Sequence, residues 1–92
     1  MSTINDDEIK RRDRHDIVVE ILRTAVNGKI KTHIMYKSNL SHRQLGKYLE
    51  FLISNALLEE ISDPEAGSHF YRVTERGMQF LKDYDRISSY ME

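Results

Sequence analysis

The sequence predicts a small, mainly α domain with a single β-hairpin, and two features of its pattern indicate this class. Apolar residues recur at spacings of three and four in several segments, which is typical of amphipathic helices. Residues 57–61 and 69–73 instead indicate two short strands around a Pro- and Gly-containing turn. The 92 residues include no cysteine and no run near the ~18 apolar residues of a membrane helix, which excludes disulfides, thiolate metal sites and a spanning segment.

The first third of the chain predicts an arm, a helix and a short extended segment. Residues 1–12 are expected to be a flexible N-terminal arm, because only two isoleucines stand among polar and charged residues. A helix follows from Asp13, a suitable N-cap, to about Asn27, where an Asn-Gly pair tolerates the left-handed conformation that ends helices. Residues 29–31 are predicted to be extended, and Thr32 is predicted to cap a brief second helix.

A longer helix is predicted from a cap at Ser41 to about Asn55. Its inward face is expected to hold Leu45, Tyr48, Leu49, Leu52 and Ala56. The opposite, solvent-facing side is expected to hold Arg43, Lys47, Glu50 and Ser54. Gly46 costs about 1 kcal/mol relative to alanine inside a helix. Its presence predicts a close approach of a neighbouring helix or of a ligand backbone.

The remaining elements complete a recognisable order. The two strands are predicted to pair as a hairpin, and Thr74 is predicted to cap a last helix. Helix, short strand, helix-turn-helix, two-stranded wing and C-terminal helix is the order of a winged helix-turn-helix. We therefore expect residues 13–76 to form a winged helix-turn-helix domain and residues 77–92 to form a C-terminal helix that serves as a dimerisation element.

Positive charge is concentrated on the predicted helix-turn-helix, although the net charge of the chain is −1. Between residues 29 and 49 there is no acid, and the basic residues there are Lys29, Lys31, Lys37, Arg43 and Lys47. From Glu50 to Ser68 every Asp, Glu, Lys or Arg is acidic. Lysines suit phosphate contacts, and an arginine near the start of the second helix suits bidentate contact with guanine.

This charge pattern predicts an interface for double-stranded DNA, in which the helix from Ser41 enters the major groove. The predicted DNA-binding residues are Lys31, Lys37, Ser41, His42, Arg43, Gln44, Lys47 and Arg72. Gln44 is expected to read adenine, Ser41 and His42 to contact the backbone, and Arg72 to reach DNA from the wing. Acids at the wing tip would be repelled by phosphate, so a purely structural hairpin is the alternative for the wing.

The last helix carries apolar residues at spacings of four, three and four: Phe80, Tyr84, Ile87 and Met91. This is the seam of a two-heptad coiled coil, and it predicts a homodimer that presents two reading helices to a pseudo-palindromic site. The alternative is that these side chains cover one wide core face of their own domain.

Several motifs of the chain are shared with a known family. They are Ile34-Met35-Tyr36, Asn39-Leu40-Ser41, Gly46-Lys47-Tyr48, and Tyr71-x-Val73-Thr74 with Gly77. Through these motifs, residues 17–80 resemble the small archaeal winged-helix DNA-binding proteins once described as chromatin-associated. The resemblance implies a DNA-binding homodimer joined through C-terminal helices that form an antiparallel coiled coil.

No pattern indicates an enzyme, a metal site or a cofactor. There is no Gly-rich phosphate loop and no nucleophile motif, and the four histidines fall on different predicted elements without metal-ligand spacing: His15, His33, His42 and His69. Neither a membrane nor a small-molecule ligand is predicted as a partner. We expect a cytoplasmic, nucleoid-associated transcriptional regulator. The alternative is a winged-helix protein–protein interaction module without intrinsic DNA affinity, which the negative net charge favours.

Overall fold

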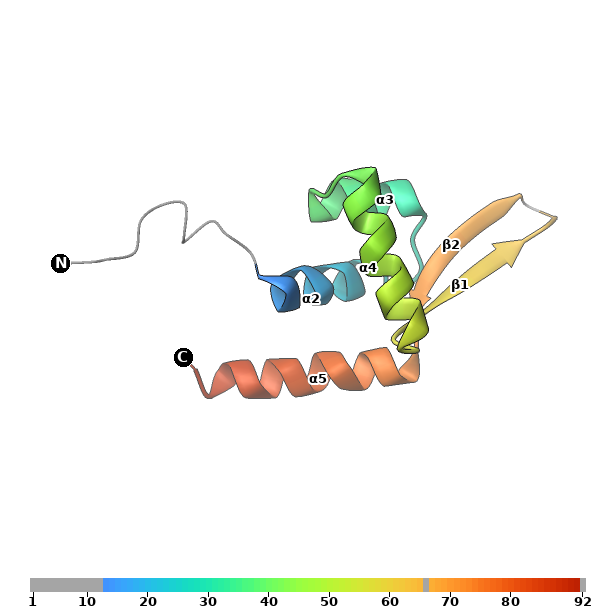
Figure 1. Ribbon diagram of the computed structural model, residues 1–92. Helices are drawn as coiled ribbons and strands as arrows, with labels where there is room; N and C mark the ends of the chain where they lie inside the picture. The colour runs from blue at the N-terminus through green and yellow to red at the C-terminus, as the bar shows by residue number, and fades with distance from the viewer. Residues whose placement is uncertain (1–12, 66, 92) are drawn as a thin grey trace.

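The computed structural model describes residues 13–65 and 67–91, and it confirms the predicted class, a mainly α fold with one hairpin (Figure 1). The elements are α2 (Arg14–Thr24), α3 (Lys31–Ser38), α4 (His42–Ser54), β1 (Leu58–Asp63), β2 (Ser68–Val73) and α5 (Glu75–Ser89). Their order is that of a winged helix-turn-helix. The arm predicted at residues 1–12 lies outside the described residues.

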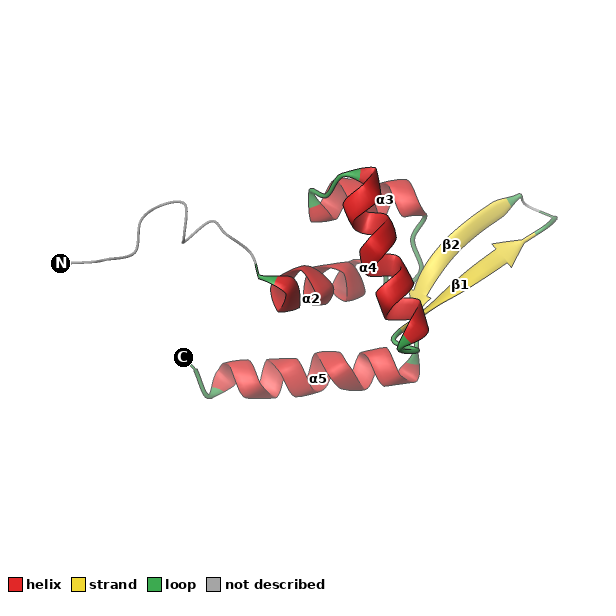
Figure 2. Ribbon diagram, viewed as in Figure 1, coloured by secondary structure: helices red, strands yellow, loops and turns green. Residues whose placement is uncertain are grey.

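The helices enclose one core, and the hairpin projects from it. α2 and α5 lie side by side, α4 runs steeply from the end of α3 to the start of α5, and the two strands point away from the helices (Figures 1 and 2). The side chains with no exposed surface, or almost none, include Ile21, Leu22, Ile34, Leu45, Leu52 and Leu58. Each contributes roughly 1.5–3 kcal/mol by leaving water.

α2 starts where the sequence predicts and ends earlier. The Asp13 carboxylate accepts a hydrogen bond from the Asp16 backbone N–H at 2.9 Å, and the Asp16 carboxylate accepts one from the Asp13 N–H at 3.4 Å. The helix ends at Thr24 rather than Asn27, because the Ala25 carbonyl accepts a bond from Val73 of β2 instead of continuing the helix. The Gly28 N–H also donates to this carbonyl at 3.0 Å, so a local turn and a contact with the hairpin together follow the end of α2.

The extended segment predicted for residues 29–31 is reduced to one residue. Lys29 exchanges two backbone hydrogen bonds with Tyr71 of β2, at 2.9 and 2.8 Å. Lys31 already belongs to α3, and the prediction that Thr32 caps this helix was wrong. Ile30 is the N-cap and makes no side-chain cap bond, because the pairing of Lys29 leaves a single residue before the helix begins.

The turn between α3 and α4 has the predicted form. Asn39 adopts the left-handed conformation with φ of 55°, and Ser41 caps α4. Leu45, Leu49 and Leu52 are buried and Tyr48 is partly buried, as the helical period predicts. Ala56 was wrongly assigned to this face. It is exposed with φ of 57°, because α4 ends at Ser54 and the chain reverses through Ala56 into β1.

The strands pair antiparallel, with Leu58 opposite Val73 and Asp63 opposite Ser68. Both are longer than predicted at the turn, where Gly67 has φ of +66°. Tyr71 lies on the core side of the hairpin and is 6% exposed. Burial, and then the hydrogen bond with the Glu60 carboxylate and its negative charge, raise the pKa of Tyr71 above its ordinary value.

The start of α5 is locked onto the turn between α4 and β1. The Thr74 hydroxyl accepts from the Gly77 N–H at 3.0 Å and donates to the Ala56 carbonyl at 2.6 Å, while the Thr74 N–H donates to the Leu57 carbonyl at 3.2 Å. A Cβ atom on Gly77 would lie 2.2 Å from that Leu57 oxygen. Gly77 therefore permits a backbone approach that no other residue allows.

Gly46 is different, because among the described residues no atom beyond its two chain neighbours and the backbone of its own helix lies within 4 Å of the position its Cβ would occupy. The neighbouring helix that the sequence analysis offered as one reason for this glycine is therefore not found among the described helices.

We predict that Gly77→Ala destabilises the fold by about 1–3 kcal/mol, because the methyl group overlaps backbone atoms that cannot move independently. Gly46→Ala is the matched control. It should stabilise the fold by about 1 kcal/mol, since alanine favours the helix and meets no obstruction. Urea unfolding of both variants against the parent chain measures these changes. Equal stability of the Gly77 variant and the parent would contradict the packing at this junction.

A second prediction concerns alkaline pH. Because the pKa of Tyr71 is raised in the folded state, its contribution to stability is present below the unfolded pKa of about 10 and is lost as pH rises above it. Tyr71→Phe removes the hydrogen bond and costs about 1 kcal/mol at neutral pH. The difference in unfolding free energy between the parent and this variant should therefore narrow between about pH 9 and pH 11.

The matched control is Tyr36→Phe, which removes the hydroxyl from a side chain that is 90% exposed. A gap between parent and Tyr71→Phe that stays constant over this range would contradict the prediction.

Candidate nucleic-acid interface

The solvent-facing side of α4 carries two cations that pair with no described carboxylate. Arg43 and Lys47 are one helical turn apart and exposed, on the side opposite the buried Leu45 and Leu49. The structure shows no ion pair between either cation and a carboxylate of the described residues. The N-terminal end of α4, with the turn that precedes it, lies on the side of the helical domain away from α5 (Figure 1). This surface is open to a large partner.

Ser41 and Gln44 begin α4 by bonding to each other's backbone. The Gln44 N–H donates to the Ser41 hydroxyl at 3.1 Å, and the Gln44 side-chain oxygen accepts from the Ser41 N–H at 3.0 Å. Bidentate reading of adenine needs both the oxygen and the nitrogen of a glutamine amide. In this conformation the amide oxygen of Gln44 already accepts the Ser41 N–H, so the structure gives Gln44 a capping role. His42 is exposed beside them.

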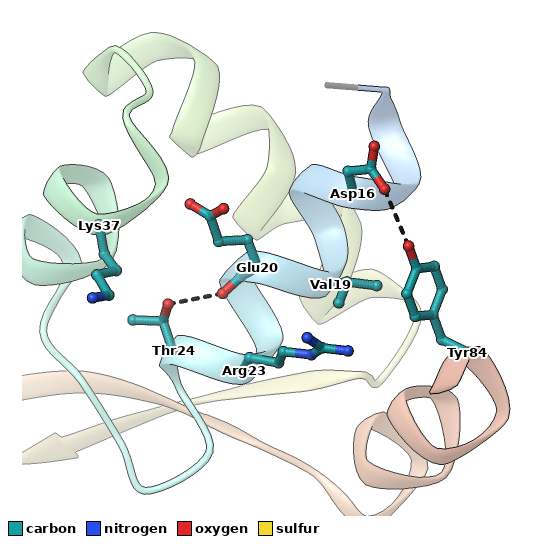
Figure 3. Close-up of a pocket in the computed structure, with 7 residues that line it drawn as sticks. All are labelled: Asp16, Val19, Glu20, Arg23, Thr24, Lys37 and Tyr84. Atoms are coloured by element: carbon teal, nitrogen blue, oxygen red, sulfur yellow. Dashed lines mark hydrogen bonds between the residues drawn. The ribbon is translucent and has the colours of Figure 1, made fainter. Parts of the chain in front are cut away.

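The two predicted lysines of α3 have different surroundings. Lys31 is partly buried at the first position of the helix. Lys37 lines a pocket of about 450 Å³ that no residue of α4 lines, and Figure 3 shows its side chain directed toward Thr24 of α2. Of the predicted DNA-binding cations, Arg43 and Lys47 therefore lie on the α4 surface, whereas Lys37 lies at this pocket.

The pocket beside Lys37 is lined by side chains of both charge signs. Its walls include Asp16, Glu20 and Arg23 of α2, and the Tyr84 hydroxyl donates to the Asp16 carboxylate at 3.1 Å (Figure 3). Arg23 is ion-paired with Asp85 of α5. These two contacts hold α2 and α5 together, which gives Asp16 and Arg23 a structural role.

The wing presents little free positive charge. Arg72 lies directly opposite Glu59 in the hairpin, and two of its nitrogens donate to one Glu59 oxygen at 2.8 and 3.2 Å. At the tip, the Asp63 carboxylate accepts from the Glu65 N–H at 3.1 Å. Arg72 would have to leave Glu59 before it could contact phosphate.

The predicted dimerisation residues fall into two groups. Phe80 and Tyr84 are partly buried and pack against the core of their own domain. Ile87 is 60% exposed and Met91 is 82% exposed, and the neighbouring Tyr90 is 80% exposed. Phe80 and Tyr84 thus fit the alternative of a wide core face. Ile87 and Met91, with Tyr90, leave the apolar end of α5 exposed to solvent.

Residues 13–65 and 67–91 contain no group of three or more side chains suited to holding a metal ion. Among the same residues no helix is long and apolar enough to cross a membrane. His69 pairs with Glu60 at 3.1 Å and packs edge-on against the Tyr71 ring, with centroids 5.5 Å apart. Its contacts lie within the hairpin.

Two basic residues that the sequence analysis did not single out lie near α4. Arg14 of α2 and Arg76 of α5 line one groove together with Lys47. They are 62 residues apart in the chain, so charge clustering along the sequence does not reveal them. The available signal was their position in the first turn of a helix, where basic residues are unfavourable.

Comparison with known proteins places these features in context. The profile of a family described as winged helix-turn-helix matches residues 11–92. An uncharacterized protein of Methanocaldococcus jannaschii, MJ0287, is 41% identical over 51 residues, which are 54% of this chain and 53% of that protein. The chain therefore spans about half the length of this curated relative.

Two solved structures share the fold. Sso10a-2, a DNA-binding protein from Sulfolobus solfataricus, superposes with a TM-score of 0.70 at 20% identity, covering 87% of this chain and 85% of that one. The PcaV transcriptional regulator from Streptomyces coelicolor gives a TM-score of 0.72 at 18% identity over 82% of this chain and 57% of that one. PcaV with its natural ligand gives 0.61 at 18% identity, over 79% and 52% of the two chains.

Proposed function

The chain belongs to the winged helix-turn-helix family, and from this premise we propose that it binds duplex DNA through α4 and acts as a transcriptional regulator. The observation that carries the proposal is the pair of exposed cations on α4, Arg43 and Lys47, which no described carboxylate neutralises. The fold presents this surface on the helix that follows the turn, which is the helix that enters the major groove in helix-turn-helix proteins.

The charge distribution supports DNA as the partner despite the net charge of −1. Binding depends on the local potential of the surface that meets the phosphates, and the described acids are mostly engaged elsewhere. Asp13 and Asp16 cap α2, Glu59 and Glu60 pair within the hairpin, and Asp83 and Asp85 pair on or beside α5. Cations that are already solvated and unpaired lose no internal ion pair when they reach phosphate.

The relatives agree with this proposal. The Sulfolobus protein is described as DNA-binding and the Streptomyces protein as a transcriptional regulator, and both share this fold. Binding to DNA would place the chain with the nucleoid. Ser41 and Gln44 then fix the start of α4 through their mutual bonds, while Arg43 contacts base edges and Lys47 contacts phosphate.

We further propose that the protein acts as a homodimer through the end of α5. Ile87, Tyr90 and Met91 are exposed apolar side chains beyond the region where α5 packs on the core. A second copy would remove them from water, and two-fold symmetry would present two α4 helices to a pseudo-palindromic site. The turn before α4 lies on the other side of α2 from α5, so this interface leaves it free (Figure 1).

We expect the double variant Arg43→Ala, Lys47→Ala to bind random-sequence duplex at least about tenfold more weakly at low salt. The slope of log affinity against log salt concentration should also become shallower by about one to two. An electrophoretic retardation assay over a salt series measures both quantities. The matched control, Lys82→Ala, removes an exposed cation from α5 and should leave both quantities unchanged.

Unchanged binding by the α4 variant would place the interface elsewhere. A parent chain with no salt-dependent binding would instead favour the alternative, a protein-interaction module.

For the dimer, Ile87→Glu with Met91→Glu should convert the protein to a monomer in light scattering, because buried charges at the interface cost more than the apolar contacts contribute. The variants leave Phe80 and Tyr84, which belong to the core, intact. Tyr36→Glu introduces the same charge at an exposed aromatic residue of α3 and should leave the mass unchanged. A dimer that survives the α5 substitutions would rule out this interface.

A further inference from the structure

The outer surface of α4 contains a glycine that the fold does not require. Gly46 lies inside α4 (His42–Ser54), where glycine is among the least favourable residues for a helix. It lacks the positive φ that Gly28 and Gly67 have. Among the described residues, no atom beyond its two chain neighbours and the backbone of its own helix lies within 4 Å of the position its Cβ would occupy. Neither backbone conformation nor packing among these residues accounts for the glycine, which leaves the close approach of a partner.

The neighbours of Gly46 on the helix surface carry opposite charges. Arg43 precedes it by three positions and Glu50 follows it by four, so the glycine lies between them on the surface of α4. Arg43 and Glu50 are exposed, on the side opposite the buried Leu45 and Leu52. Because Gly46 has no side chain, a partner that meets Arg43 and Glu50 can also approach the helix backbone between them.

Glu50 is an acid on a surface whose other charges are cations. Its carboxylate makes no ion pair or hydrogen bond with a described residue, although Lys47 lies only three positions away. Phosphate repels a carboxylate, so Glu50 is favourable in a DNA interface only if it meets a hydrogen-bond donor.

The major groove offers two such donors, the amino groups of cytosine and adenine. Adenine places its N7 acceptor beside the amino group, and this acceptor repels a carboxylate. Cytosine presents the amino group without a neighbouring acceptor of its own. The carboxylate of Glu50 therefore suits cytosine better than adenine.

We propose that this face of α4 reads base sequence, with Gly46 at the closest approach to DNA, Arg43 on a guanine and Glu50 on the amino group of a cytosine. The inference rests on the proposed function and adds the class of site, a duplex with two G·C pairs. Arg43 and Glu50 are two helical turns apart, about 10 Å along the axis, which corresponds to about two or three base pairs. A protein that contacted only phosphates would gain nothing from Glu50 and would lose helix stability at Gly46.

The first experiment is the selection of bound duplexes from a random library by the full chain. We expect the selected site to contain a guanine and a cytosine at a separation of about two or three base pairs. That cytosine is then replaced by 2-pyrimidinone, an analogue that lacks the 4-amino group. The parent chain should bind the modified duplex about fivefold or more weakly, because the carboxylate of Glu50 loses its donor.

The variant Glu50→Ala should bind the selected duplex about fivefold or more weakly than the parent. It should bind random-sequence duplex at least as tightly as the parent, since the repulsion between the acid and phosphate is removed. It should also bind the cytosine and 2-pyrimidinone duplexes equally. The matched control, Glu75→Ala, removes an exposed acid from α5 and should leave all three affinities unchanged.

The variant Gly46→Ala separates binding from stability. Its methyl group meets no obstruction within the described residues and favours the helix, so the variant should unfold at a higher temperature than the parent. The same methyl group would stand between α4 and the base edges. We therefore expect binding of the selected duplex to weaken by about fivefold or more, and unfolding of the variant cannot account for that loss.

Three results would overturn the inference while leaving DNA binding through Arg43 and Lys47 in place. The first is tighter binding of every duplex by Glu50→Ala with an unchanged sequence preference, which would make Glu50 only a repulsive acid at the edge of the basic surface. The second is parent-like affinity of Gly46→Ala for the selected duplex. The third is duplex binding from which no preferred sequence is selected. A parent chain that binds no duplex would instead overturn the proposed function together with this inference.

Discussion

The carbonyl oxygen of Leu57 is the point on which the arrangement of the last third of the chain depends. It accepts the Thr74 N–H, and it lies so close to Gly77 that a side chain there would collide with it. The Thr74 hydroxyl adds a bond to the neighbouring Ala56 carbonyl. The end of α4, the end of β2 and the start of α5 therefore meet in one small volume, which fixes the directions of the wing and of the last helix relative to α4.

Local chemistry in the sequence predicts the elements whose boundaries are local. Asp13, Ser41 and Thr74 cap helices as expected, because each cap side chain bonds the backbone N–H three positions further along. The errors occur where distant segments intervene. Val73 bonds Ala25 and shortens α2, and the pairing of Lys29 with Tyr71 moves the start of α3 ahead of Thr32. Neither contact has a signature within a short window of sequence.

In the candidate site, too, the sequence predicts what depends on local pattern and misses what depends on distant segments. The helical period was enough to predict the exposure of Arg43 and Lys47, since it depends only on the position of each residue around α4. The pairing of Arg72 with Glu59 depends on strand register, which the turn sequence alone did not establish. The Ser-x-x-Gln spacing at the start of α4 is a capping signature that can be read directly, and it accounts for Gln44 better than base reading does.

The attachment of α5 to α2 has a consequence for any assembly built on the last helix. Beyond Leu81, the Tyr84 ring packs against the core, and the polar contacts to α2 that the structure shows are the Tyr84 hydroxyl bond to Asp16 and the largely exposed ion pair of Arg23 with Asp85. Exposed pairs of this kind are weak and are screened by salt. The outer half of α5 is thus held to α2 more weakly than the start of α5 is held to the turn before β1. In the proposed dimer joined through that half, we expect the separation of the two α4 helices to adapt to the DNA.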